Sequence, residues 1–355
     1  MSSDCDDSVE LQQTVVSAAA KKRPLNLTGG NSKLFYGGEI QGTPLALNRH
    51  RGVVNYEPKE LVLSARAGTP LQEIEAVLAE QQQMLAFEPP HFGSDATLGG
   101  TIACGLSGPR RPYAGSARDF VLGVRIINGK GEILRFGGEV MKNVAGYDVS
   151  RLMCGALGTL GILLDVSLKV LPLPETEITL VQERSAEEAI RVVNGWAGRP
   201  LPISAACYDG LKLYIRLSGV PEAIAAGKDL VGGSEAREHN RIWREIREQT
   251  HAFFKSDKPL WRLSLPAHSA PIALPGKQLI DWGGAQRWLL SEASPKTIRK
   301  AAEAVGGHAT LFRHAGNRDA VFHPLSAPLK SLHQQLKQAF DPQAIFNPGR
   351  LYPDL

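Results

Sequence analysis

Thr97-Leu98-Gly99-Gly100-Thr101-Ile102-Ala103 decides the fold, because it is one of three glycine clusters in the N-terminal half of the chain. The other two are Thr28-Gly29-Gly30-Asn31-Ser32-Lys33 and Gly155-Ala156-Leu157-Gly158-Thr159-Leu160-Gly161-Ile162. Short β-rich runs separate the clusters, and no long helix is expected between them. Glycine lets backbone N–H groups approach a phosphate closely and adopt positive φ. Three such clusters favour an extended ligand, a dinucleotide, over a single phosphate.

The clusters differ in what they offer besides backbone. The first adds two hydroxyls and Lys33, which suits a pyrophosphate, although taken alone it also fits a simple turn after a strand. The third is surrounded by Leu157, Leu160 and Ile162, which suits the edge of a flat ring as well as a phosphate. The chain has neither a P-loop motif nor a Gly-x-Gly-x-x-Gly fingerprint at the head of a helix.

The length and composition of the chain limit the classes of protein to which it can belong. A length of 355 residues makes two domains the default expectation, and a formal charge of +4 is too small to indicate nucleic-acid binding. The acidic start of the chain lacks the apolar core of a secretory signal, and no run of about 18 apolar residues occurs. We therefore expect a cytoplasmic protein. The 4 cysteines form no Cys-x-x-Cys pair, which disfavours an iron–sulfur cluster or a structural zinc site within this chain.

Periodicity predicts mixed helices and strands up to a proline-rich stop at Leu171-Pro172-Leu173-Pro174. We take this stop as the boundary between domains at 1–172 and 173–355. Thr69-Pro70-Leu71-Gln72 predicts a helix start with Thr69 at the N-cap. The other expected elements of the first domain are a helix at 11–20, strands at 24–27, 61–65 and 162–170, and a hairpin of 120–128 with 132–136.

Strands and helices alternate after the boundary, and many connections are short, which favours an antiparallel α+β layer. A long helix is predicted over 237–254, with Ile242, Trp243 and Ile246 on one side, and no internal repeat is evident. The other expected elements are strands at 176–183, 203–207, 211–217, 261–265, 286–292 and 309–313, and helices at 186–196, 222–230 and 295–305. The turn residues of 340–350 predict an ordered C-terminal cap.

Residues 9–172 resemble the vanillyl-alcohol-oxidase type of FAD-binding domain, also called the p-cresol methylhydroxylase (PCMH) type. The resemblance is carried by Gly29-Gly30, Thr97-Leu98-Gly99-Gly100, Tyr113-Ala114-Gly115 with Asp119, the hairpin, Asn143-Val144-Ala145-Gly146-Tyr147-Asp148, and the third glycine cluster. The tail Phe346-Asn347-Pro348-Gly349-Arg350 is similar to the closing motif of the D-2-hydroxy-acid oxidising branch. Over its whole length the chain resembles the FAD-binding E subunits of bacterial glycolate oxidases.

The resemblance implies an α+β fold in which two α+β subdomains hold FAD, followed by a ferredoxin-like α+β cap and a short C-terminal segment. It places the pyrophosphate at the first two clusters and the adenosine part, with the flank of the flavin, at the third. It also places the segment from Asn143 to Tyr147 near the isoalloxazine ring. The implied FAD-binding residues are Thr28, Gly29, Gly30, Asn31, Ser32, Lys33, Thr97, Leu98, Gly99, Gly100, Thr101, Asn143, Tyr147, Gly158, Thr159, Gly161 and Ile162.

Two departures from the family pattern change the expectation. Relatives with histidyl-linked flavin carry His in the first glycine loop, where this chain has Asn31 and Ser32, so we expect non-covalent FAD. Cys104 could bond the ring, but packing is the favoured interpretation. Catalytic relatives carry a His-Ala-Gly-Asp-Gly-Asn-x-His metal motif, whereas this chain has His314-Ala315-Gly316-Asn317 with His323 displaced. We expect no metal site, which weakens the case for independent catalysis.

Several single residues have two interpretations. Arg262 could clamp a carboxylate or form a salt bridge at a strand edge, and it is a weak catalytic candidate together with His314 and His323. The two histidines are otherwise ordinary loop residues. Tyr147 and Asp148 could tune the flavin or make structural hydrogen bonds. Trp243 and Ile246 could form a partner surface or a core face.

The expected function is that of an FAD subunit of a heteromeric glycolate oxidase that takes part in the oxidation of glycolate to glyoxylate. An accessory or electron-relay flavin is favoured. The implied partners are a homologous catalytic flavin subunit and an iron–sulfur subunit, and attachment to the inner face of the cytoplasmic membrane through them stays open. The alternatives are a free-standing FAD-dependent oxidase of an alcohol or 2-hydroxy acid, and a non-catalytic assembly subunit with structural FAD.

Overall fold

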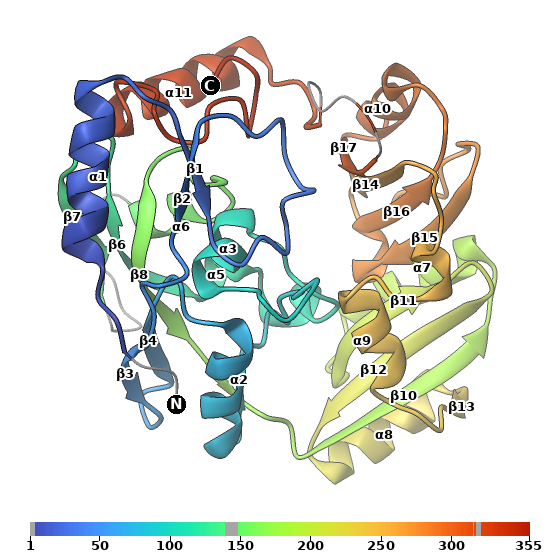
Figure 1. The fold of residues 1–355 in the computed structure, drawn as a ribbon. Helices are drawn as coiled ribbons and strands as arrows, with labels where there is room; N and C mark the ends of the chain where they lie inside the picture. The colour runs from blue at the N-terminus through green and yellow to red at the C-terminus, as the bar shows by residue number, and fades with distance from the viewer. Residues whose placement is uncertain (1–3, 139–147, 315, 317–320) are drawn as a thin grey trace.

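The computed structural model describes residues 4–138, 148–314, 316 and 321–355, and its chain forms two bodies (Figure 1). The first body contains a five-stranded sheet in the order β3-β4-β8-β6-β7. Its strands are β3 (Val53–Glu57), β4 (Val62–Arg66), β6 (Val121–Ile127), β7 (Ile133–Gly137) and β8 (Ile162–Lys169). All four pairings are antiparallel. The predicted hairpin and the strand at 162–170 are confirmed.

Helices cover both faces of this sheet. On one face, α2 (Leu71–Glu80), α3 (Leu98–Cys104) and α6 (Val149–Met153) pack their apolar residues into the largest core cluster. On the other face, α1 (Ser8–Ala20) inserts Leu11 and Val15 against Ile127, Ile162 and Leu164. Because both faces are covered, β6 is buried at 5 of its 7 positions rather than alternating.

Two small strand pairs and two short helices complete the first body. β1 (Leu25–Thr28) pairs in parallel with β2 (Thr43–Ala46), and β5 (Gln83–Met84) pairs with β9 (Leu171–Pro172). The short helices are α4 (Arg111–Ala114) and α5 (Ala117–Phe120). The predicted cap of α2 is wrong, because Pro70 occupies the N-cap position. The hydroxyl of Thr69 instead donates to the carbonyl of Arg66 at 2.7 Å, which tightens the preceding turn.

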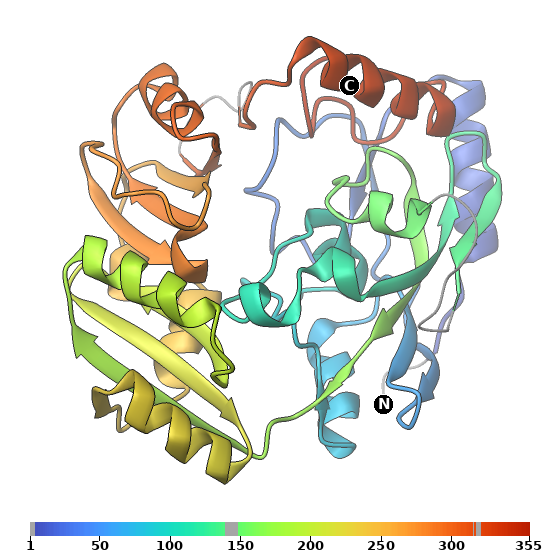
Figure 2. The same cartoon turned by 180° about the vertical axis from the view of Figure 1, so that it is seen from behind.

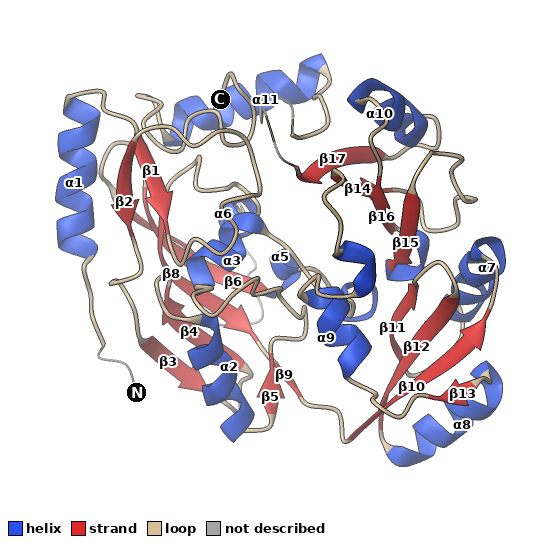
Figure 3. Cartoon of the chain, turned by 45° about the vertical axis from the view of Figure 1, so that its right-hand side comes forward, coloured by secondary structure: helices blue, strands red, loops and turns tan. Residues whose placement is uncertain are grey.

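The second body is an eight-stranded antiparallel sheet in the order β13-β10-β12-β11-β15-β16-β14-β17 (Figure 3). Its first half is β10 (Thr176–Glu183), α7 (Ala186–Ala197), β11 (Ile203–Tyr208), β12 (Lys212–Gly219), α8 (Pro221–Val231) and β13 (Ser234–Glu235). Its second half is β14 (Leu260–Ser264), β15 (Lys277–Asp281), η2 (Trp282–Gly284), β16 (Gln286–Leu290), α10 (Pro295–Glu303) and β17 (His308–Arg313).

Each half contains four strands. When they are numbered by their order along the chain, they lie side by side in the sheet in the order 4-1-3-2, which is the order of a ferredoxin-like unit. The second half has an irregular connection where the first has α7, and it has the 3₁₀ turn η2 between β15 and β16. Edge pairing of Cys207 with Asp281 joins the two halves into one sheet. The expected ferredoxin-like cap is therefore present twice. The sequence shows no repeat, because the two halves share topology but not residues.

The long helix predicted over 237–254 is wrong. The structure has α9 (Arg241–Arg247) and a separate 3₁₀ turn, η1 (Ala252–Phe254). Gln249 adopts a left-handed φ of 54°, and the N–H of Thr250 donates back to the carbonyl of Glu245 at 2.9 Å. This geometry ends a helix and normally uses glycine. The sequence has glutamine there, so it carries no visible stop signal.

The C-terminal segment returns to the first body (Figures 1 and 2). The sequence predicts no element at α11 (Ala327–Phe340), whose Leu336 and Phe340 pack against the core around the five-stranded sheet. The following turn buries Ile345 and Phe346 beside β1. The ordered cap expected at 340–350 is confirmed by these contacts. The division into domains at 1–172 and 173–355 stays a prediction.

Candidate functional site

A cleft in the first body brings the three glycine clusters together. Its volume is about 850 Å³ including space open to solvent. Twelve of the predicted cofactor residues line it: Thr28, Gly29, Gly30, Asn31, Ser32, Lys33, Thr97, Gly99, Gly100, Gly158, Gly161 and Ile162. Apolar side chains including Leu27, Leu47 and Leu163 line it as well. The cleft therefore offers polar backbone and apolar walls to one elongated ligand.

The loop after β1 presents unused hydrogen-bond donors to this cleft. The backbone N–H groups of residues 29–33 donate to no acceptor within the described part of the chain. Asn31 has a left-handed φ of 61°, which turns the loop so that consecutive N–H groups form a concave surface. Successive N–H groups in such a turn bind anions. This loop therefore fits a pyrophosphate.

Lys33 adds a buried positive charge to the same loop. Its side chain is 7% exposed, and its Nζ donates to the carbonyl of His91 at 3.1 Å and to Ser32 Oγ at 3.3 Å. Burial lowers the pKa of Lys33. Within the described residues no carboxylate pairs with it. A phosphate in the cleft would supply the missing counter-charge.

Glycine is needed at several positions of the first two clusters because the backbone there packs directly against neighbouring residues. A Cβ on Gly30 would collide with the carbonyl of Asp95, and one on Gly29 would collide with the hydroxyl of Thr97. A Cβ on Gly99 would lie 2.7 Å from the Cβ of Ala67. Gly100 differs, because its Cβ would meet only the Thr97 hydroxyl, at 3.2 Å. Most of these glycines thus serve close loop packing, and Gly100 leaves open space toward the cleft.

The second cluster forms the start of a helix, which the sequence did not predict. Thr97 caps α3, and its Oγ1 accepts from the N–H of Gly100 at 3.3 Å. The N–H groups of Leu98 and Gly99 are already bonded to the carbonyls of Thr69 and Ala67. Leu98 and Thr101 are buried and do not line the cleft. This helix therefore contributes to the cleft mainly through its shape and the Thr97 side chain, because the N–H groups of residues 98–100 already have acceptors.

Two cleft residues come from the C-terminal segment and were absent from the predicted site. Asn347 accepts from the N–H of Leu27 at 2.7 Å and donates to the carbonyl of Leu157 at 2.7 Å, so it joins two walls of the cleft. Arg350 donates to the carbonyls of Tyr36 and Gly38. The only sequence signal for them was the motif at 346–350, interpreted as a closing motif and not as part of the site.

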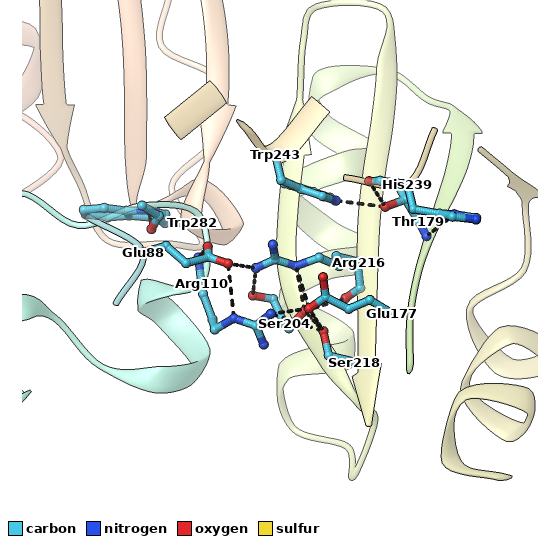
Figure 4. A network of polar contacts seen from close by, with 11 residues as sticks. Glu88, Arg110, Glu177, Thr179, Ser204, Arg216, Ser218, His239, Trp243 and Trp282 are labelled. Atoms are coloured by element: carbon cyan, nitrogen blue, oxygen red, sulfur yellow. Dashed lines mark hydrogen bonds and ion pairs between the residues drawn. The ribbon is translucent and has the colours of Figure 1, made fainter. Parts of the chain in front are cut away.

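A polar network between the two bodies joins the second body to the first (Figure 4). Arg110 and Glu88 belong to the first body, and Arg216 and Glu177 lie on β12 and β10. Arg216 pairs with Glu88 at 2.8 Å, and Arg110 pairs with both glutamates. Burial alone would raise the pKa of Glu177, but the guanidinium groups of Arg216 and Arg110 hold that pKa below its ordinary value. The four side chains thus neutralise one another between the two bodies.

Comparisons with known proteins agree with the fit of the cleft to a dinucleotide. Residues 5–137 match the FAD binding domain family. The chain is 53% identical over 352 residues, with 99% of each chain covered, to the glycolate oxidase subunit GlcE of Escherichia coli (strain K12). The chain belongs to the GlcE family. It is also 32% identical over 158 residues to glycolate oxidase subunit GlcD of Bacillus subtilis (strain 168), covering 44% of this chain and 32% of GlcD.

Solved structures show that this GlcE-family chain has the PCMH-type fold. A 4-ethylphenol oxidase from Gulosibacter chungangensis superposes with a TM-score of 0.69 at 16% identity, covering 98% of this chain and 88% of the oxidase. An alkyldihydroxyacetonephosphate synthase gives a TM-score of 0.66 at 15% identity, covering 96% and 75%. The expected fold class and the FAD cofactor are confirmed. Among the described residues, no helix is long and apolar enough to cross a membrane.

The remaining predicted cofactor residues lie elsewhere or are not described. Thr159 is buried, its hydroxyl donates to Ala156, and its carbonyl accepts from Lys337, so in this GlcE-family chain it faces the core and not the cleft. Asn143 and Tyr147 lie outside the described residues. Asp148 caps α6 by accepting from the N–H of Arg151 at 3.1 Å, which is the structural interpretation.

Cys104 lines the cleft, where burial raises the pKa of its thiol. A protonated thiol is a poor nucleophile, so packing remains the favoured interpretation.

The other single-residue alternatives concern the second body. Trp243 and Ile246 are buried in the core between the bodies, and Trp243 donates to Thr179 at 2.8 Å, so the partner-surface interpretation is wrong. His323 pairs with Glu303 at 3.1 Å, and neither it nor His314 lines the cleft. No cluster of three or more potential metal ligands occurs in the described ranges. Arg262 makes no strand-edge salt bridge there; its Nη2 donates to the hydroxyl of Tyr36 at 3.3 Å.

Proposed function

We propose that this chain is the FAD-binding subunit of a heteromeric glycolate oxidase and takes part in the oxidation of glycolate to glyoxylate. The observation that carries the proposal is 53% identity to GlcE over 99% of the chain, combined with a cleft that fits a dinucleotide. The partial match to GlcD supports a homologous flavin subunit as the catalytic partner. We propose an iron–sulfur subunit as the third component, with any membrane attachment made through these partners.

The chain's own residues would bind and orient the cofactor. The N–H groups of residues 29–33 and the ammonium of Lys33 would hold the pyrophosphate. Leu27, Leu47 and Leu163 would enclose the adenosine part, and Cys104 and Leu157 would border the ring end. FAD, when bound, supplies the capacity to accept and pass on electrons, and the protein supplies orientation and electrostatics. We propose that the FAD is non-covalent and serves as an accessory or relay flavin.

The absorption spectrum of the purified chain tests this proposal. We expect stoichiometric flavin that is released by acid precipitation, little bleaching by glycolate alone, and reduction by glycolate once the partner subunits are added. Bleaching of the isolated chain would support direct catalysis instead. FAD that is never reduced, even in the assembled complex, would favour the structural alternative. A folded chain that takes up no added FAD would refute the cofactor site.

Gly100 provides a sharper test of the pyrophosphate position. Gly100→Val places a side chain beside the cleft while meeting only the Thr97 hydroxyl, so we expect a folded protein that has lost FAD. Gly195→Val on α7 is the matched control, because a side chain there meets nothing within 4 Å. Both variants should show native circular dichroism. FAD retained by the Gly100 variant at the wild-type level would show that the site is misplaced.

A further inference from the structure

A second, larger cleft lies between the two bodies, at the connection around Pro174. α2 and β5 line it from the first body and α9 lines it from the second, on the two sides of the connection (Figure 3). Its volume is about 1310 Å³ including space open to solvent, against about 850 Å³ for the cofactor cleft by the same measure. In the described part of the chain the two clefts share no lining residue. The second cleft is therefore a separate, open site.

α9 presents two guanidinium groups to this cleft. Arg244 and Arg247 lie three positions apart, so they are neighbours on one side of the helix. Arg247 pairs with Glu248 at 2.8 Å, and that glutamate does not line the cleft. The Arg244 side chain is exposed and pairs with no side chain of the described residues. The whole of one guanidinium group and part of a second are thus available to a ligand.

The other charged groups of the described lining already have partners. The two arginines and two glutamates of the network between the bodies line the cleft and neutralise one another. Glu75 on α2 lies 3.1 Å from Nε2 of His91. The uncompensated charge of the lining is therefore the positive charge of α9. Uncompensated positive charge in a cleft favours an anionic occupant.

Apolar side chains form the remaining wall. They are Ala79, Met84, Leu85, Leu173 and Pro174. Leu173 is 45% exposed, although its N–H donates to the carbonyl of Gln82 at 2.7 Å and so fixes the backbone there. Protein interfaces combine an apolar centre with charged groups at its edge, as this cleft does. The lining therefore suits a polypeptide segment that carries both apolar and acidic side chains.

We propose that this cleft docks a short acidic segment from one of the partner subunits of the complex. Its carboxylates would accept hydrogen bonds from Arg244 and Arg247, because a guanidinium group binds a carboxylate through two parallel N–H donors. Its apolar side chains would cover Leu173 and Pro174. The inference rests on the proposed function for the existence of partner subunits, whereas the site rests on the cleft and its charges. Because both bodies line the cleft, the docked segment would also hold them together.

Co-purification through a tag on the FAD-loaded chain tests the proposal, with the homologous flavin subunit and the iron–sulfur subunit of the same organism as probes. We expect Arg244→Met combined with Arg247→Met to reduce affinity for the partner by about tenfold or more. Salt screens exposed charge pairs, so added salt should weaken the wild-type complex more than the variant complex. Arg241→Met is the matched control, because Arg241 lies on the same helix, forms exposed pairs and does not line the cleft.

Photo-crosslinking identifies the occupant. Ala79 is exposed on α2 and lines the cleft, so we expect Ala79→p-benzoylphenylalanine to crosslink to an acidic segment of a partner subunit, identified by mass spectrometry. Ala225→p-benzoylphenylalanine is the control, because Ala225 is exposed on α8 and does not line the cleft. If the large side chain at Ala79 prevents assembly while the Ala225 variant assembles, that result also supports docking in the cleft.

FAD content and the thermal midpoint show whether each variant is folded. If the double variant fails to fold, Arg244→Met alone decides, because Arg244 has no side-chain partner in the described structure. Equal assembly of the wild type and the folded variants would overturn the inference and leave the proposed function intact. Crosslinks from Ala79 to a second copy of this chain, or to a segment without acidic residues, would also overturn it. A wild-type chain that assembles with neither subunit would refute the inference and the proposed heteromeric function together.

Discussion

At the scale of single residues, Lys33 shows that a residue suited to cofactor binding can lower the stability of the FAD-free protein. A buried ammonium without a carboxylate partner destabilises a protein unless a ligand supplies the charge. We therefore predict opposite effects of Lys33→Met on two properties. FAD affinity should fall by about tenfold to a hundredfold, while the FAD-free protein should have a higher thermal midpoint than the FAD-free wild type.

Fluorescence titration with FAD and calorimetric melting of the FAD-free proteins measure the two effects. Lys330→Met serves as a control for removal of a lysine, since Lys330 is exposed and pairs with Asp354 at the surface. A Lys33 variant with unchanged FAD affinity would remove the lysine from the pyrophosphate site.

Asp281 predicts a pH dependence of stability. Burial raises its pKa to about 7 from an ordinary value near 4, so the folded state binds more protons than the unfolded state between these values. Stability should fall as the pH rises through this window, by up to about 4 kcal/mol. Asp281→Asn keeps an acceptor for the N–H of Trp282 and should flatten this part of the profile. Denaturant unfolding of both proteins from pH 4 to pH 8 measures this pH dependence of stability. An Asp281→Asn variant that is no more stable than the wild type at pH 8 would contradict the prediction.

At the scale of elements, the C-terminal segment acts as a brace for the cleft. Lys337 of α11 donates to the carbonyls of Thr159 and Phe346 and pairs with Asp341 at 2.8 Å, which positions Asn347 between β1 and Leu157. We predict that Asn347→Ala lowers the free energy of unfolding by about 1–3 kcal/mol, because it leaves a buried N–H and a buried carbonyl unpaired. It should also weaken FAD binding, since both walls line the cleft.

Asn194→Ala is the matched comparison for this variant. Asn194 on α7 donates to the carbonyls of Ile190 and Gly283, so it makes similar bonds, but within the second body. Its loss should cost comparable stability and leave FAD affinity unchanged. FAD affinity that falls equally in both variants would mean that the brace acts only through overall stability.

At the scale of the whole molecule, the Arg110, Arg216, Glu88 and Glu177 network couples the two bodies. Arg216 is 4% exposed, and its removal leaves two half-buried glutamates with one arginine. Breaking one member of a buried ionic network typically costs about 3–5 kcal/mol. We predict that Arg216→Met lowers stability by this order and accelerates proteolysis of the connection at 173–175, because the bodies separate more often. Arg241→Met, which breaks only exposed pairs, should leave the cleavage rate unchanged.

The sequence by itself determined the local features of this protein. The glycine clusters, the hairpin around Gly129-Lys130-Gly131 and the strand at 162–170 are specified by residues close together in the chain, and most residues of the cleft were predicted from them. Prolines and alternating apolar residues act over a few positions, which is why these elements could be read directly.

Only the tertiary structure decided the features that depend on distant partners. In α11, Leu332, Leu336 and Phe340 recur at helical spacing, but only Leu336 and Phe340 pack against the core. Lys337 is buried beside them because Asp341 and distant carbonyls bind its ammonium group. α9 ends at Gln249 without a glycine, and the two ferredoxin-like halves share no sequence pattern. Asn347 and Arg262 form hydrogen bonds with residues 320 and 226 positions away. Such contacts exist only once the chain has folded, because loop closure brings those partners together.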